Sequence, residues 1–475
     1  MTRLDLEALY QRLPIPVQHA ACSVVGWRTE HTRYDATFSE ILAETVARTF
    51  WSAEELAAYR DRRVAEFVEH AARTTSFYAA RLRAGSLAPS QVRSLEDLES
   101  LPILTKHEAQ EHQPELVSSG IGRRQARSTH TSGTTGGALV FPTTPYAVQQ
   151  RWAVVWRYRT WHRIERGTWC ALFAGRAVVP AKQKNPPFWR LNAPGRQLLF
   201  SGYHMSPETL PSYVDVLRKR RPPWLHGYPS LLALLAAYVL ESGIDPGYDV
   251  RWVTTGAENL LPHQSAVIQR AFGVEPIQHY GLTEGVAQIS QCELKTLHID
   301  EDYAGVEFVP VGEHGLHRVI GTNFTNPAFP LLRYDTDDMV VVRDGATCSC
   351  GRAGRVVERI DGRLEDYVIL RNNTRVGRMD HIFKDMINIQ EAQIYQRRPG
   401  EITIRVVRGR NYGETDEEQL RREIAKRVGD EIDVAVEYWD ALPRTQTGKL
   451  RFVVSDVPGG SIEPIAPASP ARGAS

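Results

Sequence analysis

The chain has 475 residues and a formal net charge of +1, with 24% charged and 42% hydrophobic side chains. This length is about three times that of a typical domain, so we expect a large buried core and more than one domain. The near-neutral charge gives no basis for a nucleic-acid partner or for binding to a membrane surface.

The apolar runs and the cysteine content argue against a membrane-spanning, secreted or disulfide-rich protein. The longest apolar run, LLALLAAYVL at 231–240, is too short to cross a bilayer and predicts a buried helix. The N-terminus carries acidic residues and lacks the long apolar region of a secretory signal. Five cysteines in this length do not make a disulfide framework. We therefore expect a soluble, cytoplasmic protein with reduced thiols.

The first predicted elements are helical and cover 38–85. A capping box, Ser52 to Glu55, opens a stretch in which apolar residues recur at helical spacing. From about 125 to 345, strand-like and helix-like runs alternate, which predicts an α/β domain with a mixed, mainly parallel sheet. Ligand loops are expected at the carboxyl ends of such strands. The strand-like runs are WCALFAG (169–175), RWVTTG (251–256), IQHYGLT (277–283) and HRVIGTNF (317–324), and the helix-like runs are 206–220, 228–243 and 262–273.

The pattern changes near the C-terminus. The runs EITIRVVRG, TDEEQLRREIAKRVG and DVAVEYW read as strand, helix and strand, which predicts a compact α+β unit over 362–457 beside a large domain over 1–361. Residues 458–475 are rich in Pro, Gly, Ala and Ser and are predicted to form a disordered tail.

A candidate phosphate loop lies at 131–136, which reads TSGTTG. Backbone N–H groups around glycines bind anions, and Ser and Thr hydroxyls add donors. An ordinary surface turn has the same composition, so both interpretations stay open for the loop alone. The Gly-Lys-Ser/Thr ending of a P-loop is missing, so the positive charge on a phosphate must come from elsewhere.

Three further stretches carry chemistry. YGLTE at 280–284 offers an aromatic face, a hydroxyl and a carboxylate, and RYDTDD at 333–338 offers a run of carboxylates after a strand. PRTQTGKLR at 443–451 puts a glycine and a lysine on a turn in the small C-terminal unit. Each of these stretches alone is compatible with a solvated loop. It is their occurrence together, in this order along the chain, that indicates a function.

In this order the four stretches resemble the signature motifs of the adenylate-forming superfamily of acyl-CoA ligases, peptide-synthetase adenylation domains and luciferases. The chain is most similar to the phenylacetate–CoA ligase branch and its capsular-polysaccharide-biosynthesis relatives, through TTSFYAARL, SLEDLESLPILTK, TTGAENL, CSCGR and HIFKDMINIQEAQI. The resemblance covers about residues 40–455. It implies an N-terminal AMP-binding domain and a small mobile C-terminal lid. It also implies a reaction in which a carboxylate attacks the α-phosphate of ATP, pyrophosphate leaves, and a nucleophile takes the acyl group.

The resemblance also implies roles for individual residues. Lys449 would reach into the site during adenylation, Thr283 would hydrogen-bond the α-phosphate, and Glu284 would bind Mg²⁺, a hard cation that prefers carboxylate oxygen. The implied ATP- and AMP-binding residues are Thr131, Ser132, Gly133, Thr134, Thr135 and Gly136 around the leaving phosphates, Gly256, Ala257 and Glu258 along the adenine, Tyr280 stacked on the base, Asp338 on the ribose, and Arg363 near the ribose and phosphate.

The chain departs from the family pattern at two places. The ribose motif usually reads Tyr-Arg-Thr-Gly-Asp, whereas 334–338 reads YDTDD. The two extra acids are unfavourable beside an anionic ligand unless they point away or bind a metal. The hinge position, usually Asp, is Glu365, and the hinge could also lie one residue to either side.

Cysteine placement gives a second hypothesis. Cys292 and His298 stand as C-x5-H, and Cys348 and Cys350 stand as C-x-C. Such a set suits a closed, tetrahedral Cys₃His site for structural zinc, and relatives in this branch carry similar pairs. The C-x-C spacing is tighter than usual, and chance placement of buried cysteines is the alternative. The zinc would clamp the segment after Glu284 to the segment before the hinge.

The resulting prediction is an ATP- and Mg²⁺-dependent ligase that joins a small organic acid to CoA, the acid being aromatic by analogy with the branch. Two alternatives stay open: transfer of the acyl group to an amine or to a carrier-protein thiol, and a non-catalytic nucleotide-binding homologue. No carrier domain is recognised, so the acceptor is expected from outside the chain. A homodimer is one assembly left open. Candidates for the acyl pocket are Tyr203, Trp224, His226 and Tyr228.

Overall fold

The computed structural model describes most of the chain. The described residues are 9–122, 125–131, 139–174, 178–180, 182–206, 208–311, 315–343, 345–363, 368–369, 371, 375–376, 382–383, 386, 388–410, 412–428, 432–444 and 450–457. The predicted tail over 458–475 therefore lies outside them.

Helices dominate the first third of the described chain. The predicted helical region over 38–85 is divided by two caps, because the Ser52 side chain accepts from Glu55 N and Thr75 caps the next helix. The reciprocal bond from Ser52 N to the Glu55 carboxylate, at 2.8 Å, completes the expected capping box. The elements are α2 (Ile15–Arg33), α3 (Ala36–Ala47), η1 (Arg48–Phe50), α4 (Ala53–Thr74), α5 (Ser76–Ala84), η2 (Pro89–Gln91), η3 (Glu96–Ser100), α6 (Lys106–Glu111), α7 (Gln113–Leu116), the hairpin β1 (Arg127–His130) and β2 (Val140–Thr143), and α8 (Pro145–Trp161).

A nine-stranded sheet forms the centre of the molecule, in the order β14-β10-β9-β8-β7-β6-β3-β5-β4. The strands from β5 through β3, β6 and β7 to β8 pair in parallel, and antiparallel strands close both edges. The predicted α/β class with a mixed, mainly parallel sheet is confirmed. The bounds are β3 (Cys170–Ala174), β4 (Trp189–Asn192), β5 (Gln197–Ser201), η4 (Gly202–His204), α9 (Leu210–Arg220), β6 (Trp224–Gly227), α10 (Pro229–Ser242), β7 (Trp252–Thr255), α11 (Pro262–Phe272), β8 (Ile277–Gly281), β9 (Gln288–Gln291), β10 (Leu297–Ile299) and β14 (Val356–Val357).

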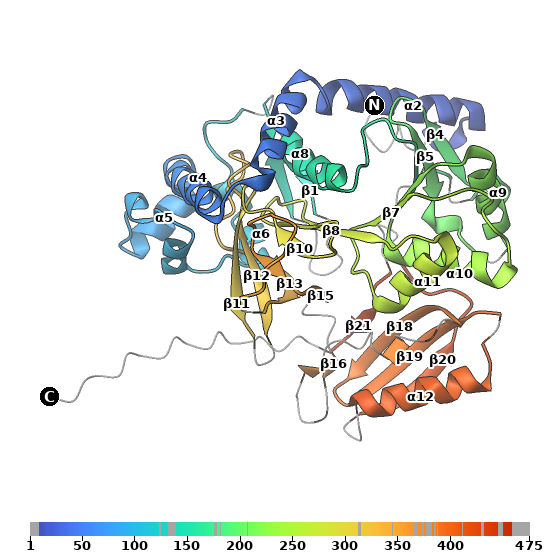
Figure 1. Cartoon of the computed structure of the whole chain (residues 1–475). Helices are drawn as coiled ribbons and strands as arrows, with labels where there is room; N and C mark the ends of the chain where they lie inside the picture. The colour runs from blue at the N-terminus through green and yellow to red at the C-terminus, as the bar shows by residue number, and fades with distance from the viewer. Residues whose placement is uncertain are drawn as a thin grey trace.

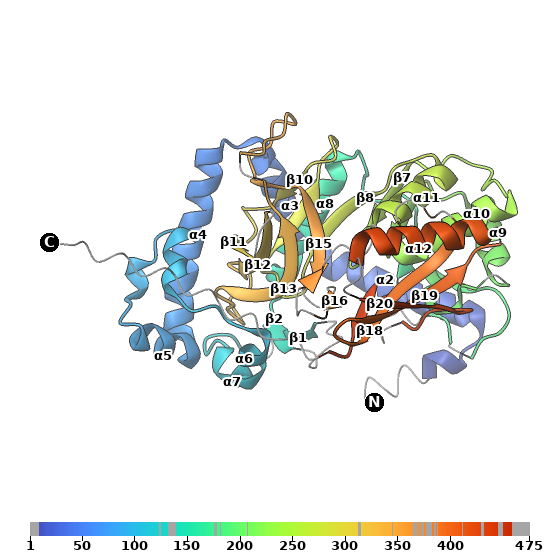
Figure 2. The ribbon, with the colours of Figure 1, turned by 90° about the horizontal axis from the view of Figure 1, so that it is seen from below.

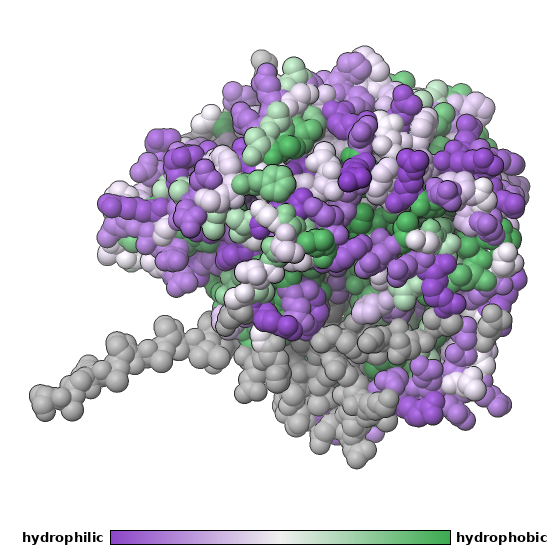
Figure 3. Space-filling view, viewed as in Figure 1, coloured by the Kyte–Doolittle hydropathy of each residue, from purple (hydrophilic) through white to green (hydrophobic). Residues whose placement is uncertain are grey.

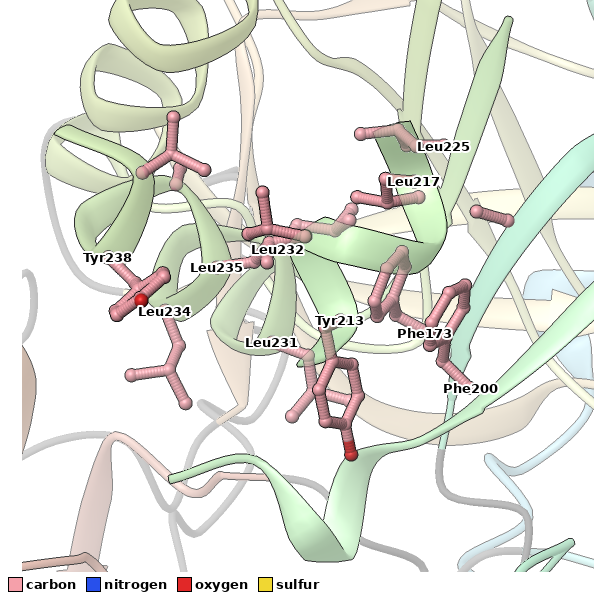
Figure 4. Packing of buried hydrophobic residues seen from close by; sticks show 14 of the residues in the cluster. Phe173, Phe200, Tyr213, Leu217, Leu225, Leu231, Leu232, Leu234, Leu235 and Tyr238 are labelled. Atoms are coloured by element: carbon pink, nitrogen blue, oxygen red, sulfur yellow. The ribbon is translucent and has the colours of Figure 1, made fainter. Parts of the chain in front are cut away.

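The two faces of this sheet differ. On one face, Phe173 and Phe200 stack with their ring centroids 4.7 Å apart and pack with the apolar side chains of α9, α10 and α11 (Figure 4). The run at 231–240 is the centre of α10 and is almost wholly buried, as expected from its composition. The other face lies under α2 and α8 (Figure 1).

A second, antiparallel sheet packs beside the first, in the order β11-β12-β13-β15. Its strands are β11 (Gly305–Pro310), β12 (Leu316–Thr322), β13 (Tyr334–Val341) and β15 (Arg359–Arg363). The carboxylate run RYDTDD was expected after a strand, and this was wrong, since most of it lies within β13.

The C-terminal residues build their own sheet, in the order β20-β19-β18-β21, with α12 against it and a separate apolar cluster (Figure 2). The expected strand, helix and strand are all present, but the sequence did not reveal β18. The elements are β16 (Val368–Ile369), β17 (Arg375–Val376), β18 (Ile389–Arg398), β19 (Glu401–Arg408), α12 (Glu414–Val428), β20 (Asp433–Tyr438) and β21 (Val453–Ser455). The division at 361/362 stays a prediction.

The surface agrees with the sequence composition. Among the described helices, none combines the length and apolar character that a membrane span requires. Hydrophilic residues predominate over α4 and α5 at the left of Figure 3.

Candidate active site

A cavity of about 1700 Å³ lies between the central sheet, α2 and α8. Alternate residues of β3, namely Cys170, Leu172 and Ala174, face it, because side chains along a strand alternate between its two faces. Ordinary ligand pockets measure about 300–1,000 Å³, so this cavity has room for a nucleotide and a second small molecule together.

The predicted site residues that the structure describes meet at this cavity. Most of them lie at the end of β8 or in the loops that follow β7 and β8, as expected for the carboxyl ends of parallel strands, while Asp338 comes from β13 and Thr131 follows β1. The predicted residues that line the cavity are Thr131, Gly256, Ala257, Glu258, Tyr280, Thr283, Glu284 and Asp338.

The remaining predicted residues are described in part or not at all. Arg363 lies on β15 as the Cα partner of Asp338, and its side chain is not described. The predicted residues outside the described part of the chain are Ser132, Gly133, Thr134, Thr135, Gly136, Glu365 and Lys449.

Two residues predicted to hold the nucleoside are linked to each other. The Tyr280 hydroxyl donates to Asp338 Oδ2 at 2.7 Å. Asp338 is only 7% exposed, and the bond connects β8 of the central sheet to β13 of the second sheet. An aromatic face and a carboxylate are thereby held side by side, which suits a purine and its ribose hydroxyls.

The two extra acids of the ribose motif, Asp335 and Asp337, differ in their position relative to the cavity. Asp335 forms an ion pair with Arg318 and does not line the cavity, whereas Asp337 does. Asp337 has φ +60°, a left-handed conformation in which the usual glycine of this motif costs nothing and aspartate is tolerated better than most residues. One extra acid therefore points away from the cavity, and the other occupies the glycine position.

The backbone of the Thr283–Glu284 segment is anchored from two sides. Arg151 Nη1 donates to the Thr283 carbonyl at 3.1 Å, and Asn323 Nδ2 donates to the Glu284 carbonyl at 3.0 Å. The Glu284 residue is 9% exposed and lines the cavity. A buried carboxylate of this kind fits a hard divalent cation such as Mg²⁺.

Glu258, in the loop after β7, makes a contact with the C-terminal unit. Its carboxylate accepts from Leu450 N at 2.9 Å and from Ser230 N at 3.2 Å. Burial raises the pKa of this carboxyl, while the bond to Ser230 and the nearby Arg444 guanidinium act in the opposite direction. Nothing in the sequence pointed to this contact, because a single glutamate after a strand has no distinctive spacing.

Other contacts strengthen the same junction. Arg444 Nη1 donates to Ser230 Oγ at 3.1 Å and also forms an ion pair with Glu391. Gln390 Nε2 of β18 donates to Glu241 of α10 at 3.1 Å. The ion pair lies within the C-terminal unit, and hydrogen bonds hold the C-terminal sheet over the cavity in this arrangement.

Two histidines on the cavity wall predict how stability depends on pH. Burial lowers the pKa of His263 and of His279 from 6.5 to about 4. The unfolded chain takes up these protons near pH 6.5 and the folded chain does not, so the stabilisation is complete above about pH 6.5 and is lost as the pH falls towards 4. We expect the thermal unfolding midpoint to fall over this window.

The matched variants are a His263→Gln/His279→Gln pair, which should flatten the slope, and His107→Gln, which should not, because His107 lies 88% exposed on α6. An unchanged slope in the double variant would contradict the assignment.

The predicted Cys/His set is brought together in space. The ligand atoms of Cys292, His298, Cys348 and Cys350 all lie within 4.8 Å of one another. The Cys292 and Cys348 sulfurs are 3.8 Å apart, and Cys350 Sγ is 3.3 Å from His298 Nε2. A Zn–S bond of about 2.3 Å in a tetrahedron places two sulfurs about 3.8 Å apart, whereas a disulfide needs about 2.05 Å.

The surroundings of this cluster also suit a metal. His298 Nδ1 lies 3.3 Å from the Gly354 carbonyl, which would fix the ring with Nε2 turned towards the three sulfurs. Cys292 is fully buried and His298 is nearly so. The four residues therefore fit a structural zinc ion.

The comparisons with known proteins agree with the geometry. Residues 369–456 match the CapK C-terminal domain family. Protein CapK of Staphylococcus aureus is 24% identical over 95% of this chain and 100% of its own length. The phenylacetate–coenzyme A ligase of Thermus thermophilus is 26% identical over 84% of this chain and 96% of its own length.

Solved structures show the same fold. A crystal structure of 2-hydroxyisobutyryl-CoA ligase in the postadenylation state superposes with a TM-score of 0.68, at 18% identity, over 86% of this chain and 91% of that chain. The same ligase in its thioesterification state, over the same shares of the two chains, gives 0.52. The chain is thus a homologue of Protein CapK and the phenylacetate–coenzyme A ligases and has the fold of the adenylate-forming acyl-CoA ligases.

Proposed function

We propose that this chain activates a carboxylic acid with ATP as an acyl-adenylate and transfers the acyl group to CoA. The observation that carries the proposal is the single cavity in which Glu258, Tyr280, Glu284 and Asp338 meet, three segments far apart in the sequence. In the first step a carboxylate oxygen bonds to the α-phosphorus and the bond to pyrophosphate breaks. In the second step a thiolate attacks the acyl carbon and AMP leaves.

The nucleoside end of the site is formed by Tyr280 and Asp338. The Tyr280 ring stacks on the adenine, and its hydroxyl holds the Asp338 carboxylate where it accepts from the ribose hydroxyls. The backbone of Gly256 and Ala257 follows β7 and passes along the base. These contacts bind and orient the nucleotide, so that the α-phosphate faces the acid.

The phosphate end is formed by Thr283 and Glu284. Their backbone is fixed by Arg151 and Asn323, which preorganises the Thr283 hydroxyl as a donor to the α-phosphate. Glu284 would hold Mg²⁺, which supplies neutralisation of phosphate charge when bound.

We further propose that 362–457 is a mobile lid that carries Lys449 into the site for adenylation. The hydrogen bond from Leu450 N to Glu258 supports this, because it brings the residue after Lys449 to the cavity. The higher similarity to the postadenylation state than to the thioesterification state of 2-hydroxyisobutyryl-CoA ligase also supports a lid seated for the first step.

The Cys292, His298, Cys348 and Cys350 cluster is proposed as a structural zinc site. Its support is that the four ligand atoms lie within 4.8 Å of one another, close enough for one ion to contact all of them. The ion would join β9 and β10, which follow the Glu284 segment, to the segment that leads into β14.

The experiment that tests the proposal is a pyrophosphate-release screen of a carboxylic acid library, with and without CoA. An acyl-CoA ligase releases pyrophosphate only with its acid, and CoA raises the turnover. If an added amine or carrier protein replaces CoA in that role, the acceptor is different. If no acid releases pyrophosphate, the chain is a nucleotide-binding homologue.

Asp338→Asn tests the nucleoside site. We expect the KM for ATP to rise about tenfold or more, since hydrogen bonds to a charged group contribute about 1.5–3 kcal/mol. Asp335→Asn is the matched control, because Asp335 lies on the same strand, is paired with Arg318 and does not line the cavity. It should lower the unfolding midpoint and leave the KM for ATP unchanged. Equal effects of the two variants on that KM would reject the assigned role of Asp338.

A further inference from the structure

One end of the cavity is walled by tryptophans and holds a buried arginine. Trp152, Trp156 and Arg159 lie three and four residues apart on α8, so they share one helix face. The Arg159 guanidinium lies 4.6 Å from the Trp156 ring centroid and 4.7 Å from that of Trp224. All four residues line the cavity.

The charge of Arg159 has no counter-ion in the described part of the chain. The residue is 5% exposed, it forms no ion pair there, and its Nε donates to no acceptor. Its polar neighbours include the Tyr158 hydroxyl and the Cys170 thiol, whose pKa values burial raises, and the His279 ring, whose pKa burial lowers, so all three stay neutral. Stacking on indole rings offsets only part of the cost of burying a cation.

Two other buried arginines of this chain have carboxylate partners. Arg157, two residues earlier on α8, pairs with Asp300 and Asp302 at 2.8 Å. Arg333 pairs with Glu307 at 2.7 Å. A third, Arg190, has no carboxylate partner, but its guanidinium donates to Gln18, to Gln183 and to two backbone carbonyls. Arg159 has neither kind of acceptor network among the described contacts.

A second arginine adds to the positive charge at this end. Arg33, in the last turn of α2, is half-buried and lies 4.8 Å over the Trp152 ring, again without an ion pair in the described chain. Glu30, an acid of α2 on the same wall, is paired with Arg166 at 2.5 Å. The wall formed by α2 and α8 therefore carries uncompensated positive charge.

The position of Arg159 along the sheet sets its distance from the reacting groups. Trp224 begins β6 and pairs with Trp252, while Gly227 ends β6 and pairs with Thr255, immediately before Gly256. Three residues of strand span about 10 Å. The arginine therefore lies about 10 Å along the sheet from the edge where the nucleotide is proposed to bind.

We propose that the acid activated by this chain is a dianion: its second anionic group, about 10 Å from the reacting carboxylate, is bound by Arg159, with Arg33 assisting. The inference rests on the proposed function and specifies its substrate class. The apolar body of such an acid would lie against Trp156 and Trp224, with one charged group at each end. A guanidinium offers planar paired donors, which suits a carboxylate and, in the same way, a sulfonate or phosphonate.

Chain-matched acids test this directly. Acid-dependent pyrophosphate release is measured with phenylacetate against para-phenylenediacetate, and with octanoate against octanedioate. We expect the wild-type kcat/KM to be at least tenfold higher for the diacid in at least one pair. Arg159→Met, which keeps an unbranched side chain without charge, should abolish or invert that preference. Arg159→Lys should retain part of it, because the charge remains.

Two further measurements test the anion site even if Arg159→Met does not fold. Arg33→Met changes a half-buried side chain, so it should fold normally and reduce the preference partially. Without ATP, para-phenylenediacetate should raise the unfolding midpoint of the wild type more than phenylacetate does, and it should lose this advantage in Arg159→Met or, if that variant does not fold, in Arg33→Met.

Failure of the dianion proposal and failure of the ligase proposal give different results. If monoacids are activated as well as or better than diacids, or if the diacid preference survives Arg159→Met, the dianion proposal is wrong and the ligase proposal stands. If no acid, of these or of the wider library, releases pyrophosphate, the ligase proposal is wrong. If the diacids also give no larger midpoint shift than the monoacids, the dianion site is rejected by binding alone.

Discussion

Replacement of Lys449 by alanine is expected to lower acid-dependent pyrophosphate release by about a hundredfold to a thousandfold, with ATP still bound. The phosphate loop at 131–136 contains no lysine, so the cation at the breaking bond must come from another segment. A charge that acts mainly in the transition state changes kcat much more than it changes ATP affinity.

The second half-reaction provides an internal control. Transfer from a supplied acyl-adenylate to CoA should continue in Lys449→Ala, because the lysine is assigned to the first step alone. Lys295→Ala removes a half-exposed surface lysine that is paired with Glu275 at 3.3 Å, and it should leave both steps unchanged. A Lys449→Ala enzyme that releases pyrophosphate at the wild-type rate would show that the assigned mechanism is wrong.

Loss of the zinc ligands is expected to have the second large effect, on stability. Protein prepared without chelator should contain about one zinc per chain. The Cys348→Ser/Cys350→Ser variant should lose the metal and unfold at a midpoint lower by roughly 5 °C or more, because structural zinc contributes its binding free energy to folding.

Cys22→Ser is the matched control, since Cys22 lies on α2 outside the cluster. It should keep its zinc and its midpoint. The zinc assignment fails if wild-type protein contains less than about a third of an equivalent, or if the double variant retains the metal.

The sequence predicted the elements whose signals are local. The capping box at Ser52, the apolar helix at 231–240 and the strand-like runs at 169–175, 251–256 and 277–283 each depend on a few neighbouring residues, and the structure has all of them. The run at 317–324 is also a strand, but it is β12 of the antiparallel sheet and not part of the mainly parallel one. β18 was not predicted, because IQEAQIYQRR mixes Gln, Glu and Arg with few apolar residues. Its backbone pairs with β19 and β21, and the local sequence of β18 does not indicate this pairing.

The site was predictable as a set of motifs and not as a set of contacts. Order along the chain predicted that Tyr280 and Asp338 share a ligand, but the hydrogen bond between them depends on how two sheets pack. The same holds for Glu258, whose partner Leu450 lies 192 residues away. Arg159 has no motif at all, and only its burial beside three tryptophans without a counter-ion marks it.

We propose that an acyl-adenylate forms in this cavity before any acceptor is present. Acid-dependent exchange of labelled pyrophosphate into ATP, measured without CoA, tests it most directly. We expect exchange that requires the acid and Mg²⁺, saturates with ATP and is lost in Lys449→Ala. Exchange that is absent with every acid, or that proceeds equally without any acid, would contradict it.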